Sequence, residues 1–271
     1  MGKKKSIGKK KSTGAQRDQQ ASPTCFPPQV LDACRPQHNS ASHQHQYIPL
    51  PQIVALHPGA VYVSPDFLSP SECRTWVQCA ESSIGFENVS HPATQHIAHR
   101  KCGRIQLDDT AVADALYERM RIIVNEVAKN VGVSHFDGTY GPVGLNHNIR
   151  LYKYEKGMSF GRHFDGSNEV PRFENGNTEI TVLIYLSSCT GGSTRFYAPK
   201  SSVIEKKKKR KGRNDDGVDD EKRAIAYTPK EGSVLLHVHG DKCLEHEADP
   251  VLEGIKYVLR TDVVYATGRS E

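Results

Sequence analysis

The sequence lacks several features that would place it in a common protein class. It has seven cysteines but no C-x-x-C pair, which argues against a zinc ribbon or a thiol redox motif. It has no apolar run long enough to cross a bilayer, so we expect a soluble protein. No apolar stretch follows the basic N-terminus, as a secretory signal would require. We therefore expect reduced thiols and a location in the cytoplasm or nucleus.

The sequence also lacks internal repeats, and its 271 residues suffice for one sizeable domain. Residues 1–46 are rich in Lys, Ser, Gln, His and Pro and have few apolar side chains to bury, so they are predicted to form a disordered basic tail. Residues 205–221 are a block of positive charge followed by a block of negative charge, which predicts a disordered insert between strands. The folded domain is expected to span residues 47–271.

Two helices are predicted in the first half of this domain. Ser69, Pro70 and Glu72 have the pattern of an N-cap, a first helical residue and a capping box. This helix is expected to end near Ser82. A second helix is expected to have Thr110 as its cap, because an apolar residue recurs at helical spacing after it. That apolar face comprises Val112, Leu116, Met120, Ile123 and Val127.

Short apolar stretches separated by turn residues follow from Gly144 onward. The predicted strands are NIRLYKY, MSFGRHFD, EITVLIYLS, STRFYAP, AIAYTP, GSVLLHVHG and KYVLRTDVVY. Closely spaced strands of this length favour an antiparallel sandwich or barrel. The predicted fold class is therefore α+β, with N-terminal helices that support a β-structure.

A histidine and an aspartate in the segment GRHFDGS suggest a metal site. His163 and Asp165 lie two residues apart at the end of a predicted strand, so they share one face while Phe164 points the other way. One imidazole and one carboxylate need a third ligand before they hold an iron tightly. The 2-His-1-carboxylate arrangement supplies that ligand and leaves positions open for other molecules.

Three downstream histidines compete for the third position. His237 and His239 lie inside the apolar strand GSVLLHVHG, where a structural role is favoured for both. His246 is followed ten residues later by Lys256, a cation that could bind a carboxylate near the metal. This combination favours His246 as the third ligand.

The segments HFD, TVLIYLSSCTGGSTRFY and LEHEADPVLEGIKYVLRTDVVY, in this order, resemble the Fe(II)/2-oxoglutarate dioxygenases, specifically the prolyl 4-hydroxylase branch. The segment DFLSPSEC at the predicted first helix also resembles that branch. The resemblance covers about residues 57–266 and is interrupted by the charged insert. It implies a double-stranded β-helix (jelly-roll) core.

The resemblance implies a role for each candidate residue. His163, Asp165 and His246 would hold the Fe(II), as the family's ligands do. Lys256, in the segment GIKYV, would pair with the distal carboxylate of 2-oxoglutarate.

The implied cosubstrate pocket includes further residues. Tyr154 and Tyr185 match family tyrosines that line it, and Thr181 shares the inward face of Tyr185 because it lies four residues earlier on the strand. Arg260 lies on the same strand face as Lys256 and is the alternative carboxylate anchor, since its guanidinium can bind a carboxylate in a bidentate manner.

The sequence departs from the family pattern in two places. Phe160 stands three residues before the first histidine, where the branch often has a tyrosine, so that hydroxyl group is absent. The turn reads GGST rather than the more usual GGET. Neither departure changes a predicted metal ligand.

The resemblance implies an enzyme that hydroxylates a C–H bond while 2-oxoglutarate becomes succinate and CO2. The favoured target is a peptidyl proline, and ascorbate is the expected reductant. The alternative is a catalytically inactive β-sandwich module that tethers nucleic acid or a ribosomal partner through lysine clusters. A cupin-like metal protein without oxygenase chemistry is a third interpretation. The intact ligand set favours the enzyme.

The lysine clusters MGKKKSIGKKK and KKKKRKGR leave several interpretations open. They could contact phosphates of nucleic acid or a ribosome, act in nuclear import, or only increase solubility. Gly2 and Ser6 match an N-myristoylation pattern, but Lys3 directly after the glycine disfavours it. No aromatic residue interrupts the clusters, so stacking on single strands is not indicated. We expect a protein or peptide substrate.

Overall fold

The computed structural model describes residues 25–35, 50–95, 97–131, 140–199 and 224–267. Its helices are α1 (Pro28–Cys34), α2 (Pro70–Cys79) and α3 (Thr110–Val131), with a π-helical turn η1 (Ala80–Ile84) and a 3-10 turn η2 (Gly240–Lys242). Its strands are β1 (Val54–His57), β2 (Val61–Ser64), β3 (Glu87–His91), β4 (Arg100–Asp108), β5 (Tyr140–Leu145), β6 (Asn148–Tyr154), β7 (Phe160–His163), β8 (Asn177–Tyr185), β9 (Thr190–Gly191), β10 (Thr194–Tyr197), β11 (Ala224–Tyr227), β12 (Val234–Val238), β13 (Glu245–Ala248), β14 (Val251–Glu253) and β15 (Lys256–Thr267).

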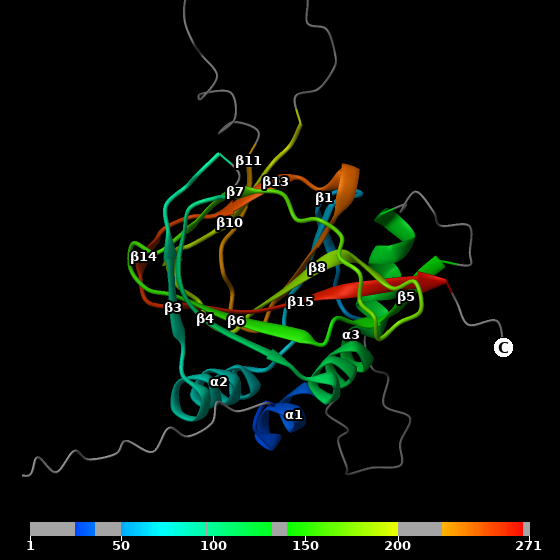
Figure 1. Ribbon diagram of the computed structural model, residues 1–271, viewed down its shortest axis with the longest axis horizontal. Coiled ribbons are helices and arrows are strands. Elements are labelled where there is room, and N and C mark those ends of the chain that lie inside the picture. Colours follow the sequence, from blue (N-terminus) through cyan, green and yellow to red (C-terminus); the bar gives the residue numbers. More distant parts are fainter. Residues whose placement is uncertain (1–24, 36–49, 96, 132–139, 200–223, 268–271) are drawn as a thin grey trace, which may run out of the picture.

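The strands form an antiparallel sheet that curls into a nearly closed, barrel-like jelly roll (Figure 1). Hydrogen-bonded neighbours follow the order β1-β2-β12-β8-β15-β6-β4-β7-β13-β10-β11, while β3 pairs with β4, β5 with β15, and β14 with β9. This arrangement confirms the predicted double-stranded β-helix core. Five of its strands, β1 to β5, precede Asn148, where the first predicted strand begins.

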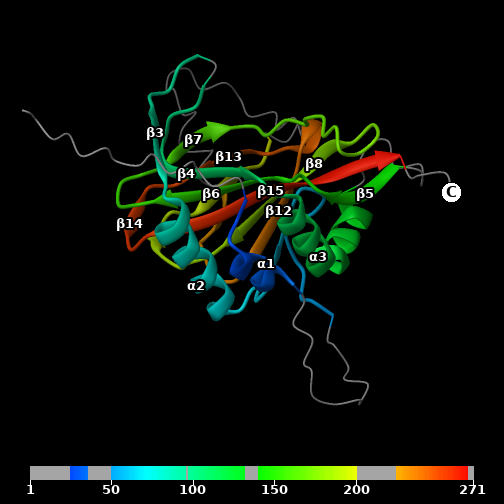
Figure 2. The ribbon, with the colours of Figure 1, turned by 60° about the horizontal axis from the view of Figure 1, so that its bottom comes forward.

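The helices cover one side of the jelly roll. Figure 2 shows α1, α2 and α3 together on one side of β6 and β15, and β7 and β13 on the other side. The side chains between helices and sheet form one hydrophobic cluster, in which Trp76, Leu116, Leu151 and Leu259 are almost completely buried. The helices therefore support the outer face of the sheet, and the inner face is left for a site.

Helix α2 begins as the sequence predicts. The Glu72 backbone N–H donates to Ser69 Oγ at 3.3 Å, and the Ser69 backbone N–H donates to Glu72 Oε2 at 2.7 Å, so the capping box is complete. Pro70 is the first helical residue. The helix ends at Cys79 and continues as the π-helical turn to Ile84, close to the predicted end.

Helix α3 and its N-cap each begin one residue earlier in the sequence than predicted. Asp109 is the cap, because its Oδ1 accepts a hydrogen bond of 3.0 Å from the Val112 backbone N–H, and Thr110 is the first helical residue. The prediction of Thr110 as the cap is therefore wrong. A carboxylate also interacts favourably with the positive end of the helix dipole. The predicted apolar face is buried.

The predicted disordered tail contains a docked helix, so the prediction for residues 1–46 is wrong for residues 25–35. Helix α1 buries Val30 and Cys34 completely, and the Phe26 ring packs edge-on against Trp76 at a centroid distance of 5.2 Å. The Phe26 backbone N–H donates to Asp109 Oδ2 at 3.0 Å. These contacts offset the entropy lost when the segment is ordered.

One arginine, Arg119, connects the three helices through hydrogen bonds. Arg119 of α3 donates to Glu72 Oε1 of α2 at 2.7 Å and to the Ala33 carbonyl oxygen of α1 at 3.2 Å. Burial would raise the pKa of Glu72, but the hydrogen bonds from Arg119 and Ser69 lower it overall. The ion pair and the helix contact thus stabilise the same corner of the domain.

Replacing Phe26 with alanine is expected to lower the free energy of unfolding by about 3 kcal/mol, because the buried ring leaves a cavity against Trp76. Urea unfolding of the full chain measures the change. Cys25→Ala is the matched control, since Cys25 is the exposed neighbour. Equal stability of Phe26→Ala and the natural chain would mean that α1 contributes nothing to the fold.

Several sequence predictions concern segments outside the described residues. These are residues 1–24 and 36–46 of the predicted tail, the domain start at residue 47, and the charged insert 205–221. Strands β10 and β11, which flank that insert, pair with each other. Among the described helices, none has both the length and the hydropathy that a bilayer span requires.

Candidate metal centre and active site

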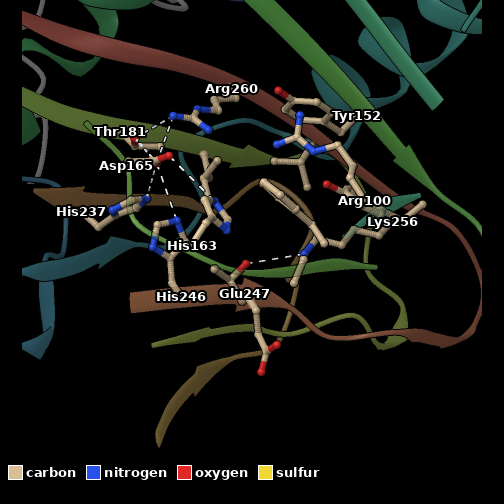
Figure 3. A pocket seen from close by; sticks show the side chains of 16 residues that line it. Arg100, Tyr152, His163, Asp165, Thr181, His237, His246, Glu247, Lys256 and Arg260 are labelled. Atoms are coloured by element: carbon tan, nitrogen blue, oxygen red, sulfur yellow. Dashed lines mark hydrogen bonds and ion pairs between the residues drawn. The ribbon is translucent and has the colours of Figure 1, made fainter. Parts of the chain in front are cut away.

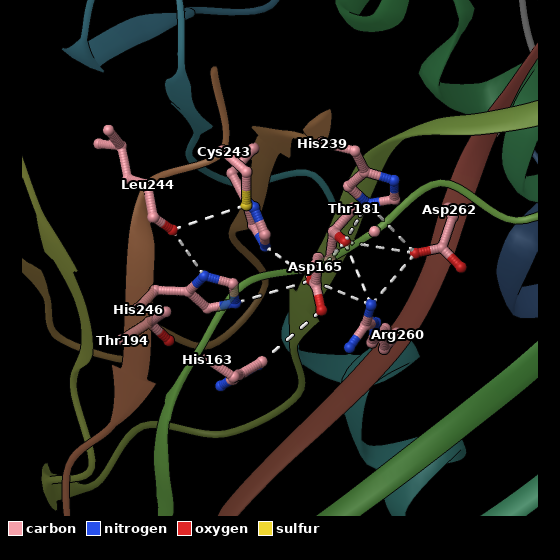
Figure 4. Close-up of polar contacts among 12 residues, drawn as sticks. His163, Asp165, Thr181, Thr194, His239, Cys243, Leu244, His246, Arg260 and Asp262 are labelled. Atoms are coloured by element: carbon pink, nitrogen blue, oxygen red, sulfur yellow. Dashed lines mark hydrogen bonds and ion pairs between the residues drawn. The ribbon is translucent and has the colours of Figure 1, made fainter. Parts of the chain in front are cut away.

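Two histidines from neighbouring strands face each other in the jelly roll. His163 ends β7 and His246 lies on β13, and the antiparallel register makes them direct cross-strand partners with ring centroids 4.2 Å apart. Asp165 follows β7 directly. His163 Nε2 is 3.8 Å from Asp165 Oδ1, and His246 Nε2 is 3.6 Å from Asp165 Oδ2 (Figure 4). The structure thus brings together the three predicted metal-binding residues, with one ligand atom of each within 4.8 Å of the others.

Main-chain carbonyls orient both imidazoles. His163 Nδ1 is 2.8 Å from the Gly161 carbonyl oxygen, and His246 Nδ1 is 2.9 Å from the Leu244 carbonyl oxygen. A carbonyl oxygen can only accept, so each Nδ1 carries a proton and donates it. Each Nε2 therefore directs its lone pair toward Asp165 when the ring is neutral, as a metal ligand must.

The Asp165 carboxylate is held in its charged form. Burial would raise its pKa, but the Arg260 guanidinium at 2.9 Å and the hydrogen bond from His246 lower the pKa well below its ordinary value. The His246 pKa rises to about 9, because the hydrogen bond to Asp165 outweighs burial. Burial and the neighbouring His246 lower the His163 pKa to about 3. A metal ion bound here would displace the His246 proton.

Thr181 and Arg260 contact Asp165. The Thr181 hydroxyl donates to Asp165 Oδ2 at 2.8 Å and lies 2.7 Å from His239 Nε2. Arg260 Nη2 lies 2.9 Å from Asp165 Oδ2 and 3.5 Å from Asp262 Oδ1. Because Arg260 already faces two carboxylates, it is less suited than Lys256 to anchor a third.

Lys256 is a buried cation on the same cavity (Figure 3). Its Nζ donates to the Gly192 carbonyl oxygen at 2.7 Å, with Thr194 Oγ1 at 3.5 Å. It lies 5.5 Å from the ring centroid of Tyr154 and 5.7 Å from that of Tyr185. Burial lowers its pKa from 10.5 to about 8. Within the described ranges, Lys256 forms no ion pair, so an anionic ligand is the partner that would stabilise its charge.

The GGST turn shapes the cavity around Lys256. Gly192 has a φ of +63°, and a Cβ added there would lie 3.4 Å from Lys256 Cδ and 3.1 Å from Val251 Cγ2. Thr194, at the end of the turn, shares a hydrogen bond of 2.8 Å with the Tyr185 hydroxyl. The sequence pattern alone indicated no role for Thr194.

Residues 149–261 match the family model described as the 2OG-Fe(II) oxygenase superfamily, and this range contains every site residue that the sequence predicted. These residues are a 2OG-Fe(II) oxygenase domain. Over residues 149–261, the match confirms the resemblance inferred from the sequence.

Plant prolyl 4-hydroxylases resemble this chain over a longer range. Prolyl 4-hydroxylase 2 of Arabidopsis thaliana is 27% identical over 206 residues, which cover 72% of this chain and 64% of that relative. Probable prolyl 4-hydroxylase 4 of the same plant is 32% identical over 130 residues, covering 44% of this chain and 42% of the relative. The chain thus spans less than two thirds of the length of these relatives.

Solved structures with prolyl hydroxylase in their names also resemble this chain. The viral collagen prolyl hydroxylase of Paramecium Bursaria Chlorella virus-1 aligns with a TM-score of 0.48 and 16% identity, covering 76% of this chain and 96% of that chain. The prolyl hydroxylase of Trichoplax adhaerens, in complex with a hypoxia inducible factor peptide fragment, aligns with a TM-score of 0.48 and 17% identity, covering 77% and 86%.

The oxygenase cavity suits the two groups in the family's name. Two imidazoles and a carboxylate are a donor set that Fe(II) accepts, and three protein ligands leave coordination positions open. Lys256 offers a buried positive charge that suits the dicarboxylate 2-oxoglutarate. Side chains of this chain would therefore bind both the iron and the dicarboxylate.

Sequence reasoning missed two further residues of the oxygenase cavity. His237, interpreted as structural, lines the cavity with its Nε2 3.4 Å from Asp165 Oδ2. Arg100 of β4 places its guanidinium carbon 3.6 Å from the ring centroid of Phe160, which in turn stacks on His163 at 3.8 Å. Phe160, noted for its missing hydroxyl, therefore packs between an arginine and a histidine. No local pattern could reveal Arg100, because only the pairing of β4 with β7 brings it there.

Proposed function

We propose that this chain is an Fe(II)- and 2-oxoglutarate-dependent dioxygenase that hydroxylates a C–H bond of a protein or peptide, with peptidyl proline as the favoured target. The observation that carries the proposal is the convergence of His163, Asp165 and His246 in the cavity that also contains the buried Lys256, which has no carboxylate partner among the described residues. The names of the plant relatives support proline as the target.

The proposal assigns a role to each residue of the cavity. His163, Asp165 and His246 hold the iron, and Lys256 pairs with the distal carboxylate of 2-oxoglutarate between the rings of Tyr154 and Tyr185. Bound Fe(II) and 2-oxoglutarate supply oxygen activation, in which 2-oxoglutarate is oxidised to succinate and CO2. Ascorbate is the proposed reductant that restores Fe(II).

The other residues of the chain would prepare the cavity for this chemistry. Thr181 and Arg260 orient Asp165 through hydrogen bonds to one oxygen, Oδ2, which leaves Oδ1 for the metal. The apolar side chains of Leu183 and Val258 line the same cavity and exclude water from it.

Succinate release tests the proposal. The full chain, supplied with Fe(II), 2-oxoglutarate, ascorbate and a proline-containing peptide pool, is expected to release succinate and to add one oxygen atom to a peptide, which mass spectrometry detects. The proposed activity would be overturned if the chain bound Fe(II) and 2-oxoglutarate but hydroxylated no peptide, either in this pool or in a fractionated cell lysate. Hydroxylation of residues other than proline would overturn only the proposed target.

The affinity for 2-oxoglutarate is expected to fall as the pH rises above 8. Lys256 has a pKa of about 8 without a ligand, so the charge that binds the carboxylate is present below this pH and lost above it. The affinity should be constant below pH 8 and fall about tenfold per pH unit above it. Anaerobic titration calorimetry measures this profile. A Lys256→Arg variant is the control and should lose affinity only at much higher pH; identical profiles for both proteins would contradict the role of Lys256.

The remaining predictions about binding partners concern the two lysine clusters, MGKKKSIGKKK and KKKKRKGR. Both clusters lie outside the described residues, so contacts with nucleic acid or a ribosome stay a prediction, as does the cytoplasmic or nuclear location, and N-terminal myristoylation stays the disfavoured alternative. Deleting residues 1–24 separates these roles from catalysis, because the deletion keeps α1. Loss of nucleic-acid binding with unchanged succinate release would assign the cluster at the N-terminus to a partner and not to the reaction.

A further inference from the structure

His237 is a buried histidine whose polar atoms are not satisfied. It lies on β12 and is 2% exposed, and neither Nδ1 nor Nε2 has a hydrogen-bond partner in the described part of the chain. Leaving a buried polar group without a partner destabilises a protein by about 1–3 kcal/mol. A purely structural histidine would be expected to find such a partner. The ring instead faces the cavity, beside His246 and Asp165 (Figure 3).

A buried thiol lies next to this histidine. Cys243 follows η2 and is 7% exposed, and its Sγ lies 3.6 Å from the Leu244 carbonyl oxygen. One ligand atom from each of His237, Cys243 and His246 lies within 4.8 Å of the other two. The ring centroids of His237 and His246 are 4.5 Å apart.

We propose that His237, Cys243 and His246 form a second metal-binding set, which takes a thiophilic divalent cation such as Zn(II). A thiolate with two imidazoles is a typical ligand combination for zinc. The set His163, Asp165 and His246 lacks sulfur and suits Fe(II). The unsatisfied nitrogens of His237 are independent support, because a metal ion is a partner that an imidazole nitrogen without a hydrogen bond can accept.

An oxygen ligand is available to complete the zinc site. Asp165 Oδ2 lies 3.4 Å from His237 Nε2 and 3.6 Å from His246 Nε2. Ligands bound at 2.0–2.2 Å to a tetrahedral ion are separated by ~3.5 Å, so these distances already match such a site. On binding, the thiol of Cys243 releases its proton to solvent and the thiolate bonds to the metal, with no change of oxidation state.

The two sets share His246, and they also share Asp165 when its oxygen completes the zinc site. Figure 4 shows Cys243 and His163 on different sides of the His246 ring. Cys243 lines a hollow bordered by Ala60 and Phe164, whereas His163 lines the cavity of Lys256, so the two sets approach His246 from different hollows although His237 and His246 also line the cavity of Lys256. A cation in the second set engages the imidazole that the iron set requires. Zinc would therefore inhibit iron loading, a consequence that rests on the proposed function, whereas zinc binding itself does not.

Cobalt(II) is the probe that tests the second set, because a thiolate bound to Co(II) produces a charge-transfer band in the near ultraviolet. The reduced, metal-free full chain is expected to show this band on titration with CoCl2. The variants Cys243→Ser and His237→Phe should lose it. His163→Ala, which removes an iron ligand, and Cys73→Ser, which removes a buried thiol of α2, should keep it.

Two outcomes would overturn the second set: absence of the band in the natural chain, or its persistence in Cys243→Ser. His237→Phe is an independent test if the serine variant does not fold, and the cooperative thermal unfolding of each variant shows which proteins can be compared. Iron loading in the presence of ZnCl2, measured as bound metal after desalting, should tolerate at least about tenfold more zinc in Cys243→Ser. Equal zinc sensitivity of both proteins would refute the inhibitory role. These readouts do not need turnover, so they stay informative if the chain is not a hydroxylase.

Discussion

The double variant His163→Ala, Asp165→Ala is expected to bind Fe(II) at least about 1000-fold more weakly than the natural chain and to release no succinate above background. Each protein ligand in a metalloprotein contributes on the order of 3 kcal/mol or more to binding, and the variant retains only His246 of the proposed set. Anaerobic titration with Fe(II) measures the affinity, and a coupled succinate assay measures turnover.

The control for this variant is His91→Ala with Asp108→Ala. It removes the same two residue types from β3 and β4, and neither residue lines the cavity. The control should bind iron and turn over as the natural chain does. Turnover in the double variant at the natural rate would remove the proposed metal site, whatever its effect on stability.

Replacing Lys256 with methionine is expected to weaken 2-oxoglutarate binding by roughly 100- to 1000-fold while leaving Fe(II) affinity unchanged. Removing one partner of a buried ion pair costs about 3–5 kcal/mol, and Lys256 is the cation that lacks a protein carboxylate among the described residues. Isothermal titration with each ligand separates the two effects.

The same substitution should stabilise the ligand-free protein. Burial lowers the pKa of Lys256 from 10.5 to about 8, so the folded state disfavours its charged form. This penalty is fully present below pH 8 and disappears as the pH rises toward 10.5. Lys256→Met should therefore raise the free energy of unfolding by about 3 kcal/mol at neutral pH and by almost nothing above pH 10.5. Destabilisation at neutral pH would mean that the charge already has a partner.

Arg260 provides the comparison that separates the two candidate anchors. Because Arg260 contacts Asp165 and Asp262, we expect Arg260→Met to weaken Fe(II) binding and to destabilise the fold, with a smaller effect on 2-oxoglutarate. A larger loss of 2-oxoglutarate affinity in Arg260→Met than in Lys256→Met would make Arg260 the anchor.

Local sequence patterns predicted the site residues whose relative positions are set by the two-residue repeat of a strand or by a short offset along the chain. His163 and Asp165 share a face because a strand repeats every two residues, and the offset between His246 and Lys256 selected one histidine among three. Strand β12 gave no such guidance. All five of its residues are buried, so alternation could not reveal which face of the strand carries His237 into the cavity.

Helix α1 escaped prediction for a different reason. Averaged over residues 1–46, the composition is polar. This average does not show the one short amphipathic stretch that the segment contains. Phe26, Val30 and Cys34 are spaced four residues apart, which is a helical repeat and a signal that a shorter window could have found. Their burial also depends on Trp76 and Arg119, which are distant in the sequence.

The carbonyl contacts of His163 and His246 have an evolutionary consequence. Each imidazole is aligned by the main-chain carbonyl oxygen two residues before it. Substitution of a neighbouring side chain leaves that oxygen in place, so drift in the surrounding sequence can proceed while the geometry of both rings is inherited unchanged. The cavity wall around them is therefore free to diversify, and an additional histidine such as His237 can arise there without loss of the older pair.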